Sequence, residues 1–276
     1  MLKYRNSLTG VDTLYLHFQK TGGFSFYNVL DQKGISRDWF SEHHGWISMP
    51  KEYQLLRKIS FIRDPYSWYI SFFFFHTNKN NPTKGSFQAM KDGPTNRIRN
   101  DKIESKRERV VTPEFRSSPF VEALSGNKTL PFNTFLCNAS NLKDFFVKNP
   151  DMYDFFLTRM QSYIENSHGW YKTWFINPEN CSEELSLDNL DMSLMQWYMN
   201  TIGILNDGVD VYKLENFNEI MTLEFGTGFL EPFRNKSDHN NYRHYYNDYT
   251  SDLIYESDNI VFSRFNYKKL NLNDPI

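Results

Sequence analysis

The sequence predicts an α/β fold, in which helices flank a central and mainly parallel sheet, and a single domain that spans residues 1–276. Three short apolar segments, at residues 13–18, 58–62 and 209–214, are typical of buried strands. Helical patterns separate these segments along the chain, and this alternation indicates a parallel sheet. A Gly-Gly turn follows the first strand and an Asp-Pro dipeptide follows the second, as at the start of a helix.

The composition supports a sizeable core and argues against several classes of partner. Aromatic residues make up 17% of the 276 residues, so material for a core is ample. The net charge of -2 predicts no general attraction to nucleic acid or to a membrane surface. No apolar run approaches the roughly 20 residues of a membrane span, and the start lacks the apolar region of a signal peptide. The chain as given is therefore expected to be cytoplasmic, with no transmembrane segment.

The two cysteines, Cys137 and Cys181, form neither a disulfide framework nor a metal-binding spacing. We expect both to be reduced thiols, and the sequence predicts no metal site.

The first two strands are each expected to lead into a helix. After the strand at residues 13–18, a helix should begin near residues 25–30 and stop near Gly34. After the strand at residues 58–62, Asp64 is suited to cap a helix whose first residue is Pro65. That helix is apolar nearly all round, which indicates burial on several sides.

A basic insert follows at about residues 76–118, where lysine and arginine outnumber the acidic residues and Pro and Gly interrupt the pattern. A short helix is considered around residues 101–109. Two interpretations of this basic segment remain open. It is either a solvated helical face, or a flap that covers a bound cofactor or steers an anionic acceptor.

Helical patterns resume in the second half of the chain, around the third strand at residues 209–214. A long helix is predicted at residues 240–258, because its apolar positions recur at helical spacing. The other predicted helices cover residues 119–124, 151–164 and 187–204.

The first candidate site is the segment that links the first strand to its helix, with the sequence Lys20-Thr21-Gly22-Gly23-Phe24-Ser25. A glycine loop before a helix lets backbone N–H groups approach an anion, and the hydroxyls and the lysine add donors and charge. In the common nucleotide loop the glycines precede the lysine, whereas here Lys20 comes first. An ordinary tight turn with a surface lysine is the competing interpretation.

The second candidate site is Arg63, at the carboxyl end of the second strand, with Ser71 two turns into the next helix. Ligands of open α/β sheets bind beyond the carboxyl ends of the strands. If the two strands are neighbours, Arg63 lies beside the first loop and suits a second phosphate. The alternative is that Arg63 pairs with a nearby carboxylate and that Ser71 is a small packing residue.

Together, LHFQKTGGFSF and KISFIRDPYSWYISFFFF resemble the sulfotransferases that use 3′-phosphoadenosine-5′-phosphosulfate (PAPS), and most of all their carbohydrate branch, the heparan, chondroitin and dermatan O-sulfotransferases. The resemblance implies a P-loop-like sulfotransferase fold. It implies that residues 20–25 bind the 5′-phosphosulfate, and that Arg63 and Ser71 bind the 3′-phosphate. The C-terminal third is similar to the family's closing pattern and adds Lys236 and Ser237 to the cofactor-binding residues.

The resemblance also implies a mechanism. A base removes the proton of a hydroxyl acceptor, expected on a carbohydrate, and Lys20 stabilises the leaving phosphate of the product, adenosine 3′,5′-bisphosphate (PAP). The base is expected in the phrase Glu42-His43-His44, where His43 and His44 remain alternatives and Glu42 is a third candidate. His17 is expected to be packed or hydrogen-bonded, and Glu215 to be structural or a neighbour of the acceptor.

Two other functions remain open from the sequence. One is a small-molecule kinase that uses ATP and Mg²⁺, which the inverted order of Lys20 and the glycines and the lack of a clear Mg²⁺ ligand disfavour. The other is a nucleotide- or glycan-binding module that has lost catalysis, which Lys20, Arg63 and Ser71 disfavour.

Overall fold

The structure is a computed structural model. It describes residues 1–39, 46, 49–77, 98–99, 102–103, 119–125, 131–166, 185–229 and 241–274.

A five-stranded mixed sheet organises the fold, with the strand order β3-β1-β2-β4-β7. Strands β2, β4 and β7 are parallel neighbours, whereas β1 is antiparallel to both β2 and β3. The predicted α/β class is therefore confirmed, and the sheet is mixed because an N-terminal hairpin that the sequence analysis missed adds β1. The bounds are β1 Leu2–Arg5, β2 Asp12–Leu16, β3 Arg37–Trp39, β4 Arg57–Ile62 and β7 Val209–Lys213.

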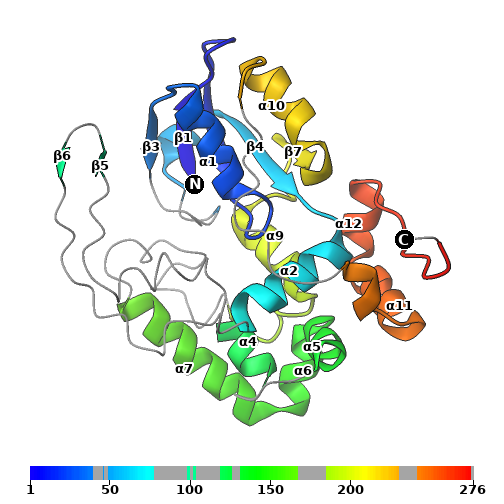
Figure 1. The fold of residues 1–276 in the computed structure, drawn as a ribbon. Helices are drawn as coiled ribbons and strands as arrows, with labels where there is room; N and C mark the ends of the chain where they lie inside the picture. Colours follow the sequence, from blue (N-terminus) through cyan, green and yellow to red (C-terminus); the bar gives the residue numbers. More distant parts are fainter. Residues whose placement is uncertain are drawn as a thin grey trace.

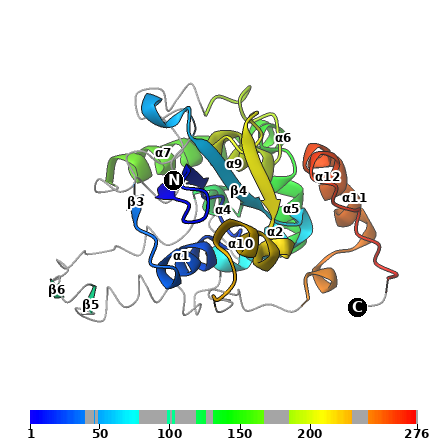
Figure 2. The same cartoon turned by 90° about the horizontal axis from the view of Figure 1, so that it is seen from above.

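Helices cover both faces of this sheet (Figures 1 and 2). On one face, α1 (Gly23–Gln32) and α10 (Phe217–Phe225) bury Tyr15, Ile59 and Phe61. On the other face, α2 (Pro65–Thr77) and α9 (Leu194–Ile202) pack against Leu14, Leu16 and Ile62. Successive strand residues point to opposite faces, so a strand that is apolar throughout supplies both core clusters.

Helix α2 runs from the edge of the sheet into a helical layer below it (Figure 1). Trp68 and Phe72 of α2 stack with their ring centroids 4.9 Å apart, and both are fully buried. The apolar character of α2 on all sides therefore predicted its burial correctly. The same helical layer contains α4 (Pro119–Leu124), α5 (Phe132–Ala139), α6 (Leu142–Lys148) and α7 (Pro150–Asn166).

The single long helix predicted at residues 240–258 is wrong. The chain forms a 3-10 turn, η6 (Tyr242–Tyr245), and then α11 (Asp248–Ser257), followed by α12 (Asn259–Arg264). Asn247 ends the first piece because its side chain accepts a hydrogen bond from the backbone N–H of Thr250, and the Thr250 hydroxyl accepts one from the Asn247 N–H. This reciprocal cap starts a new helix.

Two other helix predictions are also corrected. The helix predicted from residue 187 begins only at Leu194, because the Ser193 hydroxyl caps it by accepting from the Gln196 N–H. Within the stretch proposed as a helix at residues 101–109, the described part is a strand: β6 (Lys102–Ile103) pairs with β5 (Ile98–Arg99). Short 3-10 turns complete the fold at η1 (Lys51–Tyr53) and η5 (Leu214–Asn216). Across the described ranges, no helix combines the length and the apolar character that crossing a membrane requires.

The junction of α11 and α12 holds a fully buried carboxyl group, Asp258. The Ser193 hydroxyl donates to Asp258 Oδ1, and the Tyr69 hydroxyl also faces the group. Burial raises the pKa of Asp258 from 3.8 to about 7, and these hydroxyls only partly oppose that rise. Between about pH 4 and pH 7 the folded protein therefore binds a proton that the unfolded chain has released. The contribution of Asp258 to stability is greatest below pH 4 and is lost as the pH rises through 7.

We predict that Asp258→Asn makes the protein progressively more stable than wild type as the pH rises from 4 to 7. The difference in the free energy of unfolding should grow by up to about 1.4 kcal/mol per pH unit, since the amide cannot ionise. Urea denaturation across this range measures it. Asp252→Asn, which removes the exposed carboxylate of α11 that pairs with Lys269, is the control for the loss of a negative charge near this junction. The prediction would be contradicted if the stability difference between Asp258→Asn and wild type did not change with pH.

Candidate functional site

The two candidate motifs meet at one edge of the sheet. Strand β2 pairs in parallel with β4, so the segments that follow Leu16 and Ile62 leave the sheet at the same end. The expectation that these strands are neighbours is confirmed. Lys20 and Arg63, each a few residues beyond its strand, are close enough that the charge of Arg63 acts on Lys20.

The loop after β2 has a defined conformation. Lys20 has a positive φ of 65°, which is uncommon for a residue with a side chain. Two hydrogen bonds hold the loop in this form. The Thr21 hydroxyl donates to the Phe18 carbonyl at 2.7 Å, and Trp68 Nε1 of α2 donates to the Gln19 carbonyl at 2.9 Å. The hydroxyl of Thr21, which the sequence assigned to a ligand, therefore braces the loop in this structure.

Close packing favours glycine at both positions, and backbone geometry also favours it at Gly22. Gly22, with φ 81°, precedes α1, and a Cβ there would lie 2.6 Å from a methyl carbon of Leu214. A Cβ at Gly23 would lie 2.1 Å from His17 Nε2. His17 is buried, and its Nδ1 lies 2.9 Å from the Tyr27 hydroxyl, so the expectation of a packed, hydrogen-bonded histidine is confirmed.

The ammonium group of Lys20 rests on an aromatic ring. Its Nζ lies 4.0 Å from the centroid of the Phe75 ring, a cation–π distance. Burial and, to a smaller extent, the positive charge of Arg63 together lower the pKa of Lys20 from 10.5 to about 7. An anion bound beside Lys20 would oppose this lowering, because its negative charge favours the charged form of the amine.

Arg63 is the second cation of the site. Its Nε donates to the Ser67 hydroxyl at 2.7 Å. Burial lowers the pKa of Arg63, while the negative charges of Glu215 and Asp64 act to raise it. Within the residues that the structure describes, neither Lys20 nor Arg63 forms an ion pair with a carboxylate. The alternative in which Arg63 is paired with a carboxylate thus finds no ion pair in the described part of the chain.

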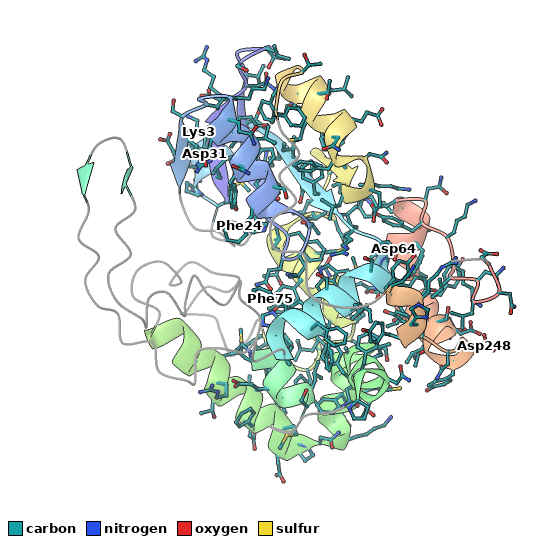
Figure 3. All side chains as sticks on the ribbon, viewed as in Figure 1. Lys3, Phe24, Asp31, Asp64, Phe75 and Asp248 are labelled. Atoms are coloured by element: carbon teal, nitrogen blue, oxygen red, sulfur yellow. The ribbon has the colours of Figure 1, made fainter. Side chains whose placement is uncertain are left out.

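One face of α2 is turned toward these two cations. Ser67 contacts Arg63, and Phe75 contacts Lys20. Ser71 lies midway between them at the i, i+4 spacing, which places all three on the same helical face. Ser71 is almost fully buried and has a partner of its own. Figure 3 shows Asp64 and Phe75 near the two ends of α2 and Phe24 at the start of α1.

A carboxylate that accepts two hydrogen bonds stabilises the Arg63 end of the site. Glu215 Oε1 accepts from the Asp64 N–H at 3.0 Å, and its Oε2 accepts from the Tyr267 hydroxyl at 2.9 Å. Asp64 Oδ1 caps α2 by accepting from the Ser67 N–H, and burial raises the pKa of Asp64 to about 6. Glu215 is therefore structural, since it joins the ends of β4 and β7 to the C-terminal segment.

The remaining predicted residues lie outside the described part of the chain. These are the base candidates Glu42, His43 and His44, the C-terminal pair Lys236 and Ser237, and almost all of the basic insert. Trp46, the nearest described residue to the base candidates, donates its N–H to Thr201 O and packs on Gly203. Of the other predicted loop residues, Phe24 is half exposed and Ser25 is buried with a partner.

Sequence reasoning missed Ser67, Phe75 and Tyr267. Ser67 and Phe75 flank Ser71 by four residues on each side, so the helical spacing was a usable signal for both. Tyr267 comes from the opposite end of the chain, and only the tertiary fold brings it to Glu215.

The site presents two cationic side chains, Lys20 and Arg63, at one edge of the sheet and is suited to bind an anion. Nowhere in the described ranges do three or more His, Cys, Asp or Glu residues cluster as metal ligands would. A comparison with known proteins adds no relative: no family model, no curated protein and no solved structure matches the chain.

We predict that Gly23→Ala destabilises the protein by about 1–3 kcal/mol, because the new methyl group overlaps the His17 ring. The double variant His17→Ala/Gly23→Ala should lose less stability than the sum of the single variants, since removing the ring makes room. Denaturant unfolding of all four proteins measures the coupling. If the stability loss of the double variant equals the sum of the losses of the two single variants, the steric explanation is contradicted.

Proposed function

We propose that this protein is a sulfotransferase that moves the sulfuryl group of PAPS to a hydroxyl acceptor on a carbohydrate. The observation that carries the proposal is the pair of partly buried cations, Lys20 and Arg63, at the carboxyl ends of adjacent parallel strands without a carboxylate ion pair in the described residues. Burying charge is costly unless a counter-charge is present, so such a pair calls for an anionic ligand. PAPS carries anionic groups at two positions, which matches two cations on separate loops.

Each cation has a separate role in the proposal. Lys20 lies in the loop before α1, where backbone N–H groups at the helix start can also donate to an anion, so we assign it to the 5′-phosphosulfate. As the bond between sulfur and the bridging oxygen breaks, negative charge grows on the leaving phosphate, and the ammonium of Lys20 stabilises it. Arg63, with its hydrogen bond to Ser67, is assigned to the 3′-phosphate.

The other half of the reaction concerns the acceptor. Its oxygen forms the new bond to sulfur, and its proton passes to a base, for which we propose His43 or His44, with Glu42 as the third candidate. The products are then the sulfated acceptor and PAP. The proposal of a carbohydrate acceptor rests on the resemblance of the two motifs to the carbohydrate sulfotransferases.

We predict that PAP raises the thermal stability of the protein without any metal ion. At a concentration one hundred times the dissociation constant, the stabilisation should be about 2.7 kcal/mol. Arg63→Gln should weaken binding by roughly tenfold to a hundredfold, since it removes charge-assisted contacts. Thermal-shift titrations measure both effects. The control is Arg5→Gln, which changes an exposed arginine of β1. Stabilisation by Mg-ATP but not by PAP would replace this proposal with a kinase.

We predict that Lys20→Ala lowers the rate of sulfuryl transfer by on the order of 10²–10³, by analogy with the loss of one electrostatic contact to a developing anion. The measurement is turnover of labelled PAPS with a panel of glycan acceptors. Lys51→Ala, which removes an exposed lysine of η1, should transfer at the wild-type rate. Wild-type turnover by Lys20→Ala would refute the assignment of Lys20, and binding of PAP without transfer to any acceptor would indicate a module that has lost catalysis.

A further inference from the structure

We propose that Phe75 is a positioning residue for Lys20. The face of the Phe75 ring holds the ammonium group beside Arg63 and favours its charged form before an anion binds. The anion-binding consequence of this inference rests on the proposed function, whereas the effect on the ammonium group itself does not. Phe75 is the last residue of the second quoted motif, and the sequence analysis gave it no role.

The contact has the geometry of a strong cation–π interaction. Lys20 Nζ lies 4.0 Å from the centroid of the Phe75 ring, well inside the limit of about 6 Å for such pairs. In the described part of the chain Lys20 has no carboxylate ion pair. The ring therefore supplies the negative potential that a carboxylate supplies to most buried lysines.

The backbone directs Lys20 toward this ring. A left-handed conformation at a residue with a side chain costs free energy and persists only where its surroundings enforce it. Here the bonds from Thr21 to Phe18 and from Trp68 to Gln19 enforce it on both sides of Lys20. Trp68 and Phe75 both belong to α2, so the same helix fixes the loop and carries the ring.

The ring acts against two effects that favour the neutral amine. Burial and the charge of Arg63 both lower the pKa of Lys20, which is about 7, so near neutral pH the ring helps to decide whether the group is charged. Among the described residues, other titratable groups around this contact are His17 beneath the loop and His76 against the Phe75 ring. The titratable groups around Arg63 are Asp64, Glu215, Tyr242 and Tyr267.

An aromatic ring differs from a carboxylate in what it leaves available. A carboxylate would compete with the ligand for the ammonium hydrogens, and binding would first have to break that ion pair. A ring occupies one side of the ammonium through its face and leaves hydrogens free to donate to an anion. Phe75 thus holds Lys20 in place without competing for the ammonium hydrogens that an incoming anion would accept.

The first test measures the ammonium group directly. In protein with isotope-labelled lysine side chains, an NMR titration gives the pKa of Lys20, and Lys20→Arg assigns its signal. Phe75→Leu should lower this pKa by about one pH unit, so the charged fraction at pH 7 falls from about half to about one tenth. Phe75→Tyr keeps the ring face and should leave the pKa at the wild-type value. Equal pKa values in Phe75→Leu and wild type would overturn the proposal.

The second test measures binding of PAP by calorimetry at pH 5.5 and pH 8. At pH 5.5, which lies below the Lys20 pKa in wild type and in Phe75→Leu, the ammonium group is mostly charged in both proteins. Phe75→Leu should therefore bind PAP nearly as well as wild type at this pH. At pH 8 its affinity should be about tenfold lower, because more of the variant must take up a proton on binding. A loss of the same size at both pH values would mean that Phe75 acts only through packing, and would overturn the proposal.

The two tests separate this inference from the proposed function. If wild-type protein binds neither PAP nor sulfate at either pH, the proposed function fails, while the titration of Lys20 still decides the role of Phe75. His76→Asn removes the titratable neighbour of the ring and should leave the effect of Phe75→Leu intact. If Phe75→Leu does not fold, Phe75→Met provides the same loss of the ring with a flexible side chain of similar size.

Discussion

Two like charges held close together, with no carboxylate ion pair among the described residues, set the main constraint on this structure. Lys20 and Arg63 repel each other and are both partly removed from water, so their proximity is unfavourable until an anion binds and the rest of the fold must impose it. The parallel pairing of β2 with β4 brings the two loops to one edge, and α2 then packs against both. The two hydrogen bonds that Glu215 accepts connect β7 and the C-terminal segment to the same edge.

The strands around the site were predictable because their signal is local. The apolar runs that give β2, β4 and β7 end at glycine, proline or charged residues, so each boundary was found within one or two residues. Strand β1 was missed because it alternates apolar and charged residues over only four positions. The long C-terminal helix failed for another reason, since its apolar spacing continues across Asn247 although the cap interrupts the backbone.

The site was predictable only in part, because several of its residues also have packing or hydrogen-bonding roles that residue type alone does not indicate. The sequence identified Lys20, Arg63 and the two glycines, but assigned the glycines to backbone freedom and ligand approach alone. In the structure their small size is also imposed by His17 and Leu214, and Leu214 lies almost two hundred residues away. Such contacts depend on the tertiary fold, and no local pattern reveals them. The same holds for the role of Thr21, whose hydroxyl turns back to the loop.

The strand order also determines when the chain can fold. Strand β7 pairs with β4 through partners such as Lys58 and Val209, and Asn6 in the first hairpin donates to Glu224 across 218 positions of sequence. Contacts between such distant segments form slowly, since a long loop must close before they can contribute. The sheet cannot be completed during synthesis until β7 has left the ribosome. Until then one edge of β4, the strand that precedes Arg63, remains open to pairing with other chains.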